Sequence, residues 1–596
     1  MRNVSTENNQ NERKYQGQNV FLRLGKYLFT FRFSALCCLL LVLVSNAFSL
    51  ISPSLSGKAI DSIKLDLKTG VADVDLPVVF RYCGLMLLCY ALAAVLSYTL
   101  SVLTTRLSQK ITRKIRKEAY DKLLELPVGY FDKLQAGDVI SRLSYDIDTI
   151  NTSLTGDMIQ IFTSLITVSG AFFMMLRISW KMLLVFLVTL PFSVLLTVRR
   201  TKMVRPLFRK RSAALGKLNG YSEEILSGTK TIKAYGKEDA FSLRYNKQNS
   251  EASEAYYKAD YEAATIGPSV NFINNLSISI ISVAGACFYL LGFLSLGNIS
   301  SFILYGRRFS GPINEFSNII ADLQSLRSAA ERVFTLMDEL PEKEDDPDAV
   351  TLPSVKGEIR FDHVGFSYDP EKEIIHDLSL EIPSGTTVAI VGPTGGGKTT
   401  IVNLLMRFYD PQKGEILLDG VPIQKLRRKD LRGAFTMVLQ DTWLMSGSVY
   451  ENIAYGKEGA TREEVEEAAK KAGIHGFIKS LPLGYETRME DGGLNISKGQ
   501  KQLLTIARSM LSDAKMLILD EATSNVDTRT EIQIENAMLK LMEGKTCFVI
   551  AHRLSTVRNA DLILVVKDGD VIETGTHEKL IKDGGFYAEL YRSQFN

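Results

Sequence analysis

The sequence predicts a chain in two parts, an all-α membrane part of six helices followed by an α/β part. Long uncharged runs fill the first half, which indicates helices that cross a membrane. From about residue 356 onwards, strand-like and helix-like runs alternate, as they do in α/β folds. The second half also carries GPTGGGKTT at 392–400, a glycine-rich segment directly after an apolar run.

Five uncharged runs define the membrane part, at 33–57, 82–105, 158–176, 182–198 and 263–306. A helix needs about 20 apolar residues to cross the hydrocarbon core of a bilayer, so the fifth run is too long for one crossing. Its segment LGNISS (296–301) predicts a tight outer loop between two helices, which brings the total to six. The first run is too long for the apolar core of a signal peptide, so we expect a retained anchor.

Basic residues orient the spans. They cluster before the first span, between the second and third, and between the fourth and fifth, as Arg23, Lys26, Arg32, Arg106, Lys110, Arg113, Lys114, Arg116, Lys117, Arg199, Arg200, Lys202, Arg205, Arg209, Lys210 and Arg211. Lys and Arg favour the cytoplasmic side, so we expect a multi-pass protein of the cytoplasmic (inner) membrane with both termini cytoplasmic.

Two long cytoplasmic excursions follow from this orientation, at about 106–157 and 199–262. Both are expected to be mostly helical, and each has a turn-like interruption, at 126–137 and 215–224. These interruptions are either tips that dock on a soluble partner or plain loops.

Composition narrows the classes of function. The net charge of +3 is too small to indicate nucleic-acid binding by itself, and the six cysteines lack CxxC or zinc-finger spacing. We therefore expect small buried thiols and no structural metal. The acidic, proline-containing segment 338–354 is typical of a linker, which gives a transmembrane domain at 1–337 and an α/β domain at 355–596.

The segment 388–400 has the spacing of a phosphate-binding loop, with an apolar strand followed by Gly392, four residues, and then Gly-Lys-Thr. Gly395, Gly396 and Gly397 let the backbone wrap a phosphate, because a Cβ atom would block the turn or the approach. The helix that follows directs its positive N-terminus at the anion.

Polar side chains after this loop and after a second apolar strand complete the expected site. Lys398 is expected to reach the β- and γ-phosphates of a nucleotide, and the hydroxyl of Thr399 to ligate Mg²⁺. Thr400, the last residue of the segment, is also expected to take part in binding the nucleotide. The strand LILD ends in Asp520-Glu521. An acid at that edge holds Mg²⁺ through water, and the next acid orients or deprotonates an attacking water.

Three further candidates are weaker when taken singly. His552 follows another apolar strand and is able to contact a γ-phosphate, although a lone histidine is more often structural. Gln440, in MVLQD, is an uncharged group that is able to sense Mg²⁺ or water. Tyr368, in FSYDP, offers a ring for stacking on adenine, although a tyrosine in a strand is usually a packing residue.

The order of these segments resembles the nucleotide-binding domain of ABC transporters, over about 356–596: Tyr368, GPTGGGKTT, Gln440, NISKGQ, LILDEATS and AHRLS. The six spans with two long excursions resemble the membrane domain of exporter-type half-transporters. The resemblance implies an all-α six-helix transmembrane domain followed by an α/β P-loop ATPase domain. It also implies a dimer of two such chains, with two ATP molecules and Mg²⁺ held between the soluble domains.

The same resemblance implies a role for each matching residue. Glu521 is the catalytic base, His552 the switch histidine and Gln440 the coupling glutamine, which also approaches the metal. Asp520 supports Mg²⁺. Asp527 matches a loop that contacts the partner across the dimer.

The segment NISKGQ departs from the Leu-Ser-Gly-Gly-Gln signature of the family. Ser497, Gly499 and Gln500 are retained, so the groups that bind the γ-phosphate on the partner chain's P-loop remain. Ile496 replaces the leucine, and Lys498 stands at the permissive third position. This variant signature favours a heterodimer with a second half-transporter, and a homodimer stays open.

The predicted function is ATP-driven efflux of amphiphilic small molecules, drugs or lipids. The alternatives are a homodimeric lipid or peptide exporter and an ATP-gated channel or regulator. Substrate-binding candidates are polar residues of the last two spans, which line a cavity or bond between helices: Asn271, Asn274, Asn275, Arg307, Arg308 and Glu315.

Overall fold

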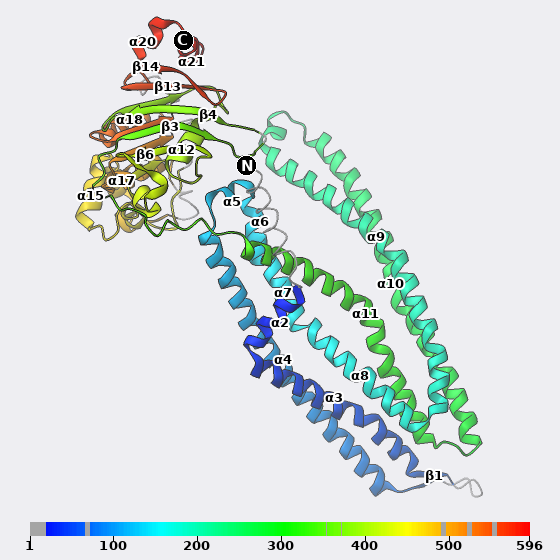
Figure 1. Ribbon diagram of the computed structural model, residues 1–596. Coiled ribbons are helices and arrows are strands. Elements are labelled where there is room, and N and C mark those ends of the chain that lie inside the picture. The colour runs from blue at the N-terminus through cyan, green and yellow to red at the C-terminus, as the bar shows by residue number, and fades with distance from the viewer. Residues whose placement is uncertain are drawn as a thin grey trace. The chain divides into compact units, whose positions relative to one another are not determined.

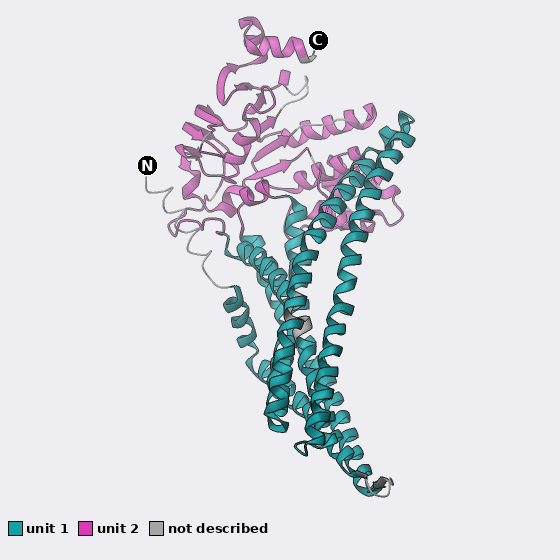
Figure 2. Cartoon of the chain, turned by 90° about the vertical axis from the view of Figure 1, so that its right-hand side faces the viewer, with its two compact units in different colours: residues 1–125, 135–339 teal, residues 126–134, 340–596 magenta. Residues whose placement is uncertain are grey.

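The computed structural model describes residues 20–65, 72–352, 354–370, 372–440, 442–489, 496–520, 527–550 and 557–595. The chain divides into two compact units, which Figure 2 colours separately. Unit 1 comprises residues 1–125 and 135–339, and unit 2 comprises residues 126–134 and 340–596. The short segment 126–134 therefore leaves the first half of the chain and packs within unit 2.

Unit 1 is almost entirely helical (Figure 1). Its elements are α2 (Val20–Thr30), α3 (Arg32–Asp61), β1 (Ile63–Leu65), β2 (Ala72–Val74), α4 (Leu76–Glu125), α6 (Ala136–Ser141), a π-helical turn (Arg142–Asp146), α7 (Ile147–Thr155), α8 (Asp157–Ile178), α9 (Trp180–Ala234), α10 (Glu238–Leu290) and α11 (Leu296–Asp338). The long helices α3, α4, α8, α9, α10 and α11 contain the five uncharged runs of the sequence, and the fifth run is divided between α10 and α11.

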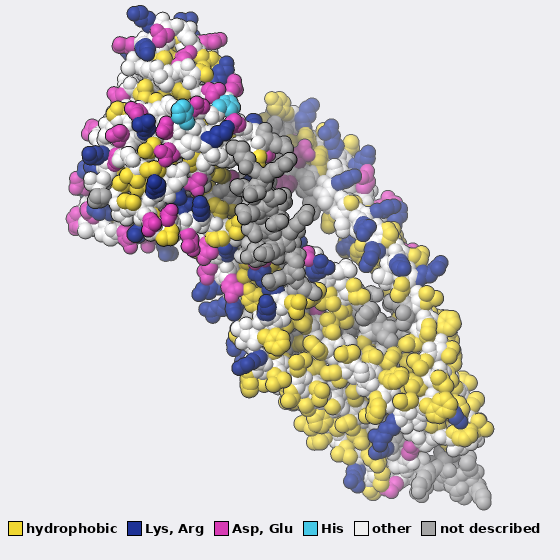
Figure 3. All heavy atoms as spheres, in the orientation of Figure 1, with side chains coloured by type: hydrophobic (Ala, Val, Ile, Leu, Met, Phe, Trp, Pro, Cys, Tyr) yellow, Lys and Arg dark blue, Asp and Glu magenta, His cyan; other side chains and the backbone are white. Residues whose placement is uncertain are grey.

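Four helical stretches among the described residues are long and apolar enough to cross a membrane: Arg32–Asp61, Leu76–Glu125, Ala136–Ile178 and Glu238–Leu290. A shorter apolar stretch, Trp180–Phe192, opens α9. Figure 3 shows hydrophobic side chains covering unit 1 over α3, α4 and α8, while Lys and Arg gather over parts of α4, α9 and α10. The crossings by α9 and α11 stay predictions.

The prediction of a turn-like interruption at 215–224, the second tip, is wrong. This segment lies inside α9, which continues to Ala234. Packing against α10 holds the helix together there, through stacking of Tyr221 on Phe241 at 6.3 Å. The chain reverses later, at 235–237, where Gly236 adopts a positive φ of 56°.

The predicted outer loop LGNISS (296–301) is also misplaced. These residues form the first turns of α11, and the reversal lies at 291–295. Gly292 has a positive φ of 76°, which ends α10. The Ser295 hydroxyl then caps α11 by accepting from the Asn298 amide at 3.1 Å.

One close helix contact at this end of unit 1 depends on two glycines, Gly57 and Gly297. A Cβ atom on Gly297 would lie 1.9 Å from the Gly57 carbonyl oxygen, so α3 and α11 meet through bare backbone. Asp61 fastens the contact by accepting from the Gly297 amide at 2.7 Å and from the Ser295 hydroxyl at 2.7 Å.

Unit 2 contains α5 (Val128–Lys133) and two main sheets. Its other elements are β3 (Ile359–Phe366), β4 (Ile375–Ile382), β5 (Thr387–Val391), α12 (Lys398–Leu405), β6 (Lys413–Leu418), β7 (Val421–Pro422), a 3₁₀ turn (Ile423–Lys425), α13 (Arg428–Gly433), β8 (Phe435–Val438), β9 (Gly447–Ser448), α14 (Val449–Ala454), α15 (Arg462–Lys471), α16 (His475–Ser480), a 3₁₀ turn (Gly484–Glu486), β10 (Arg488–Met489), α17 (Lys498–Leu511), β11 (Met516–Asp520), α18 (Thr528–Met542), β12 (Thr546–Ile550), β13 (Leu562–Lys567), β14 (Asp570–Gly575), α20 (His577–Asp583) and α21 (Phe586–Phe595).

The larger sheet has the order β14-β13-β5-β12-β11-β8, in which only β14 is antiparallel to its neighbour. The smaller sheet, β4-β3-β6-β7, is antiparallel. Alternate residues of β5 serve two cores: Ala389 and Val391 pack with helices such as α17, whereas Val388 and Ile390 pack with the smaller sheet. The larger sheet is therefore buried on both faces, as parallel sheets usually are.

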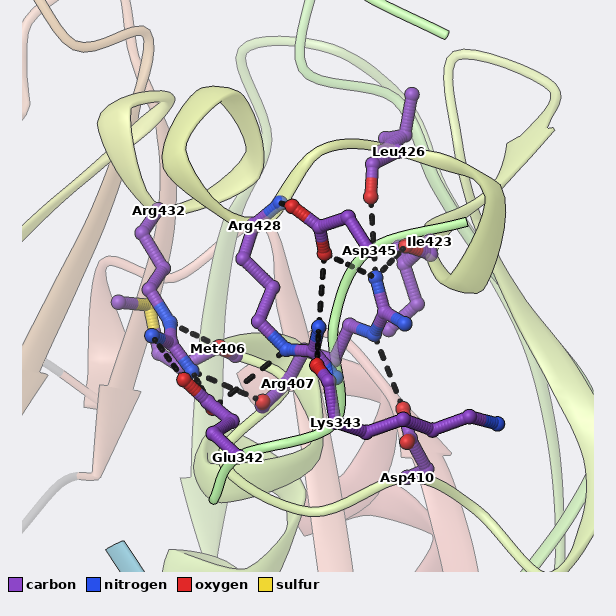
Figure 4. A network of polar contacts seen from close by, with 10 residues as sticks. All are labelled: Glu342, Lys343, Asp345, Met406, Arg407, Asp410, Ile423, Leu426, Arg428 and Arg432. Carbon is purple, nitrogen blue, oxygen red and sulfur yellow. Dashed lines mark hydrogen bonds and ion pairs between the residues drawn. The ribbon is translucent and has the colours of Figure 1, made fainter. Parts of the chain in front are cut away.

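The acidic segment after α11 is bound to unit 2 by ion pairs (Figure 4). Arg432 Nη2 lies 2.5 Å from Glu342 Oε1 and Arg428 Nη1 lies 2.8 Å from Asp345 Oδ1. Because Arg428 is buried, its paired charge fixes the path of the chain more than an exposed pair would. The middle of the predicted linker at 338–354 is therefore held against the α/β unit.

Candidate nucleotide and coupling site

The phosphate-binding loop connects β5 to α12 and owes its shape to glycine. Gly392 has φ 148°, and a Cβ atom there would lie 2.0 Å from the Val566 carbonyl oxygen. Gly395 and Gly397 also have positive φ, at 83° and 107°. At Gly396 a Cβ atom would lie 3.0 Å from the same Val566 oxygen, so the loop is a cradle that side chains would fill.

The Lys398 ammonium lies across this cradle. Its Nζ donates to the carbonyls of Gly392 at 2.8 Å and Pro393 at 2.9 Å. Burial lowers the pKa of Lys398, while the nearby Asp520 carboxylate acts in the opposite direction. The hydrogen bonds of this buried cation among the described residues go to two loop carbonyls, which a phosphate group is able to replace.

The remaining loop residues differ in exposure. Thr399 is exposed at the start of α12, so its hydroxyl is accessible to a ligand. Thr400 is buried, and its role in nucleotide binding stays a prediction. The cradle, the lysine and the exposed hydroxyl together fit the triphosphate of a nucleotide, with Thr399 and Asp520 as the side chains suited to Mg²⁺.

The other predicted catalytic residues follow the carboxyl ends of neighbouring parallel strands. Asp520 ends β11, and Gln440 is exposed two residues beyond β8. Since β5, β12, β11 and β8 are adjacent in that order, their carboxyl ends form one edge of the sheet. Glu521 and His552 lie outside the described residues.

Tyr368, predicted to stack on adenine, belongs to an aromatic cluster. Its ring contacts Phe366 and Tyr409 edge to face, with centroids 4.9 Å apart in both pairs. Asn403 of α12 donates to the Tyr368 hydroxyl at 3.1 Å. The ring is 43% exposed, so it keeps a free surface beside the loop. Stacking on a base stays a prediction.

Tyr409 was not predicted, although it is the residue that joins this site to α5. Its hydroxyl donates to Asp132 Oδ2 at 2.5 Å. A Cβ atom on Gly129 would lie 2.8 Å from the Tyr409 ring, so α5 presents bare backbone to the aromatic face. The predicted first tip, at 126–137, is therefore interrupted as expected, and its helix contacts Tyr409 within unit 2.

The turn that carries Tyr409 is held by a buried arginine (Figure 4). Arg407 Nε donates to Asp410 Oδ1 at 3.0 Å, and its Nη1 donates to the carbonyls of Ile423 and Leu426 at 3.2 and 3.0 Å. These bonds hold the residues on both sides of Tyr409. A signal was present in the sequence, since the aromatic pair of RFYDP directly follows the P-loop helix.

The variant signature forms an intact helix N-terminus. The Ser497 hydroxyl accepts from the Gln500 amide at 3.2 Å, and the Ser497 amide donates to Gln500 Oε1 at 2.9 Å, which is a capping box. Ile496 is buried in the core of unit 2 and Lys498, the first residue of α17, is exposed. Both departures from the family pattern are accommodated without loss of structure.

Two other residues named in the sequence analysis make contacts within the described chain, and the partner contact predicted for Asp527 stays a prediction. Asp527 caps α18 by accepting from the Thr530 amide at 3.0 Å, and this bond lowers the pKa of the Asp527 carboxyl. In the membrane unit, Arg308 donates to the Ser49 hydroxyl of α3, so it acts as a contact between helices. The side chain of Glu315 is not among those described.

Comparison with known proteins agrees with this geometry over nearly the whole chain. A family described as "ABC transporter transmembrane region" matches residues 35–313, and one described as "ABC transporter" matches 375–524. An uncharacterized ABC transporter ATP-binding protein of Bacillus subtilis (strain 168), YfiC, is 40% identical over 574 residues, which cover 96% of this chain and 94% of that protein. The chain belongs to the ABC transporter family.

Two further relatives of this ABC transporter define its type. A fatty acid ABC transporter ATP-binding/permease protein of Mycobacterium bovis is 43% identical over 520 residues, covering 87% of this chain and 82% of that protein. A bacterial Atm1-family ABC exporter solved with ATP bound is 30% identical, with a TM-score of 0.75, and the match covers 95% of this chain and 98% of that one.

The ABC transporter described here is therefore a half-transporter of the exporter type, with one helical membrane domain fused to one ATPase domain. It is a multi-pass membrane protein whose ATPase is coupled to transport. ABC exporters work as dimers in the membrane. The predictions of family, fold class and enzyme class are confirmed.

Proposed function

We propose that this half-transporter uses ATP to export amphiphilic small molecules, lipids or drugs, across the cytoplasmic membrane, with both termini cytoplasmic. The observation that carries the coupling is the contact of α5 with Tyr409, which in turn contacts Tyr368 beside the phosphate loop. The fatty acid named for one relative supports an amphiphilic substrate.

The proposed roles at the ATP site follow from the side chains present. Lys398 gives up its two loop carbonyls for the β- and γ-phosphates. Thr399 and Asp520, with Gln440 at the adjacent strand end, hold Mg²⁺, which neutralises phosphate charge when bound. Glu521 activates the attacking water as the base.

The remaining predicted residues act around this centre. His552 contacts the γ-phosphate, and the ring of Tyr368 stacks on the adenine. In the dimer, the ATP held by one P-loop is completed by Ser497, Gly499 and Gln500 of the other chain, at the N-terminus of α17.

The transport cycle is a switch between two conformations biased by ATP. ATP closes the two soluble domains on each other, and α5 passes this movement to the membrane helices. Hydrolysis removes the bias, so the transporter returns to the form that opens to the cytoplasm.

We propose a heterodimer with a second half-transporter, on the ground of the variant signature at Ile496 and Lys498. Expression of this chain alone tests it. The heterodimer proposal fails if the purified single chain forms a homodimer whose substrate-stimulated ATPase is lost in Glu521→Gln. It is supported if activity requires co-expression of a second half-transporter.

Substrate class is tested by ATPase stimulation in nanodiscs, with fatty acids, phospholipid analogues, cationic dyes and hydrophilic peptides compared at equal concentration. We expect the first three classes to stimulate and the peptides not to. Lys398→Ala is expected to lower the rate by about 10²- to 10³-fold, the effect of losing one contact to the transition-state charge. Lys429→Ala, an exposed lysine of α13, is the matched control and is expected to leave the rate unchanged. Stimulation by peptides alone would refute the proposed substrate class.

The alternative of an ATP-gated channel makes a different prediction. It requires ion current across a planar bilayer when ATP is added, without accumulation of any substrate. Current that depends on ATP in the purified protein would overturn the exporter proposal.

A further inference from the structure

The helix α2 has one face fixed to the rest of unit 1. Arg23 Nη1 pairs with Asp338 Oδ2 at 2.6 Å, and its guanidinium lies 4.3 Å from the centre of the Phe334 ring. The Tyr27 hydroxyl donates to Glu118 at 2.5 Å, and Leu24 is buried between these polar anchors. These contacts therefore hold α2 against the ends of α4 and α11.

The other side of α2 borders a groove of about 620 Å³, between α2, α3, α4, the end of α7 and the start of α8. Its floor is made by buried apolar side chains, Cys38, Val42, Leu107 and Leu154. Its walls are large exposed hydrophobic side chains from α2 and α3, among them Phe29, Phe33 and Leu36. Figure 3 shows this face of unit 1 covered by hydrophobic side chains.

The one hydroxyl group among the residues that line the groove, that of Thr104, already has a hydrogen-bond acceptor in the protein. Thr104 Oγ1 donates to the Leu100 carbonyl of its own helix at 2.9 Å and lies 3.7 Å from Cys38 Sγ. The floor is lined by apolar side chains and its one hydroxyl is already bonded, so it suits a hydrocarbon chain and disfavours a polar solute.

The groove has the length of one leaflet. Along α3 it extends from Arg32 to Val42, which at the rise of an α-helix is about 15 Å. The hydrocarbon core of a bilayer is about 30 Å thick, so this length equals about half of it. One acyl chain that enters from one leaflet would fill the groove from mouth to end.

Arg32 stands at the mouth and gives the groove its polarity. The residue is exposed, and no ion pair to it is found among the described residues. An arginine at the end of a helix reaches the headgroup level and binds phosphate there through its planar fork of donors. An apolar groove with one cation at its mouth is complementary to an anionic lipid.

Gly25 leaves the groove open at α2. A Cβ atom at this position would meet nothing within 4 Å. Glycine in the middle of a helix is less favourable than alanine, and no close contact with a neighbour requires a glycine at this position. Its absent side chain widens the groove.

We propose that this groove binds one acyl chain of an anionic phospholipid of the cytoplasmic leaflet, with the lipid phosphate at Arg32. The lipid is a bound component of the transporter and not its transported substrate, so the proposal stands whatever molecule is exported. It joins α2, which is anchored to the end of α11, to the membrane-facing side of α3 and α8.

Fluorescence quenching by brominated lipids tests the proposal on the full-length protein in nanodiscs. Trp180 and Trp443, the two tryptophans of the chain, are first replaced by phenylalanine. Phe162→Trp then places a reporter in the groove, and Tyr98→Trp, an exposed aromatic of α4, places one outside it. Brominated phosphatidylglycerol and brominated phosphatidylcholine are compared at equal mole fraction.

At the groove reporter we expect phosphatidylglycerol to bind about two- to fivefold more strongly than phosphatidylcholine, the range of an exposed charge pair. Arg32→Gln is expected to abolish this preference, whereas Arg113→Gln, which removes an exposed charge of α4 outside the groove, is expected to keep it. Gly25→Leu adds a side chain that narrows the groove, and it does not weaken α2 because leucine has a higher helix propensity than glycine. We expect this variant to reduce quenching by both lipids. The control reporter is expected to show no preference.

Equal quenching by the two lipids at the groove reporter, or a preference that survives Arg32→Gln, would overturn the proposal. Absence of quenching by either lipid would also overturn it, because protein would then cover the groove. Crosslinking between copies through a cysteine placed at Leu36 would identify that cover as a second chain.

Discussion

Tyr409→Phe is expected to separate transport from ATP hydrolysis, because it removes one hydroxyl from the contact with α5 and leaves the ring. That hydroxyl donates to Asp132 at 2.5 Å. The ring keeps its edge-to-face contacts with Phe366 and Tyr368, at 5.5 and 4.9 Å between centroids. Burial first, and then the bond to Asp132, raise the pKa of Tyr409, so the hydroxyl remains a donor throughout the neutral pH range.

The magnitude follows from the kind of bond that is lost. Hydrogen bonds to charged groups contribute about 1.5–3 kcal/mol, and the exposure of Asp132 to water places this one at the lower end. A loss of about 1.4 kcal/mol changes the ratio of docked to undocked α5 about tenfold. We therefore expect transport per ATP hydrolysed to fall by up to about tenfold, while basal ATPase stays close to that of the unchanged protein.

The assay measures substrate uptake and phosphate release in the same vesicles, for Tyr409→Phe, Asp132→Ala and the double variant. We expect the double variant to be no worse than either single one, because both remove the same bond. Tyr455→Phe, at an exposed tyrosine of unit 2, is the control. Additive effects, or uptake and hydrolysis that fall in parallel, would refute the docking argument.

Three further predictions concern packing and reactivity. Gly392→Ala is expected to lower the melting temperature of the nucleotide-free protein more than Gly395→Ala, since only the first Cβ meets the backbone, at 2.0 Å; scanning fluorimetry of both checks this. Gly297→Ala is expected to destabilise unit 1 by about 1–3 kcal/mol through overpacking, whereas Gly311→Ala, with open space around it, is expected not to; equal melting temperatures would contradict this. Burial raises the pKa of the Cys547 thiol to about 12, so maleimide at pH 8 is expected to leave it unmodified until the protein is denatured.

The nucleotide loop and the strand ends were predictable because their residue types have few other uses. A strand followed by Gly392 and its spacing to Lys398 requires a particular backbone, and the structure has positive φ at Gly392, Gly395 and Gly397. The strand end at Asp520 was predicted from LILDE, and the structure ends β11 at this residue. Gln440, proposed from MVLQD, follows β8 at the same edge of the sheet, and the roles of both residues stay predictions.

The helix reversals were less predictable because a glycine is able either to lie inside a helix or to end one. Gly216 and Gly220 lie inside α9, since packing against α10 outweighs their poor helix propensity. Gly236 and Gly292, by contrast, adopt positive φ and end helices. Local sequence alone does not distinguish these cases, because the deciding contacts come from the neighbouring helix.

The contact between α5 and Tyr409 was out of reach for a different reason. It joins residues 277 positions apart in the chain. Asp132 lies in the predicted tip, but Tyr409 belongs to no motif that was recognised. The sequence left two alternatives open for 126–137, a docking tip or a plain loop, and it contained no pattern that identifies the docking partner. The position of Tyr409 becomes clear only once Arg407 is seen to hold the turn around it.

The most direct test of the account is vectorial transport by the purified protein, or by its purified complex with a second half-transporter, in inside-out proteoliposomes. A fluorescent fatty acid is supplied outside with ATP, and its accumulation in the lumen is followed with time. The account predicts accumulation that requires ATP and is lost in both Lys398→Ala and Glu521→Gln. Accumulation that continues in those two variants, or hydrolysis of ATP with no movement of any amphiphile, would contradict it.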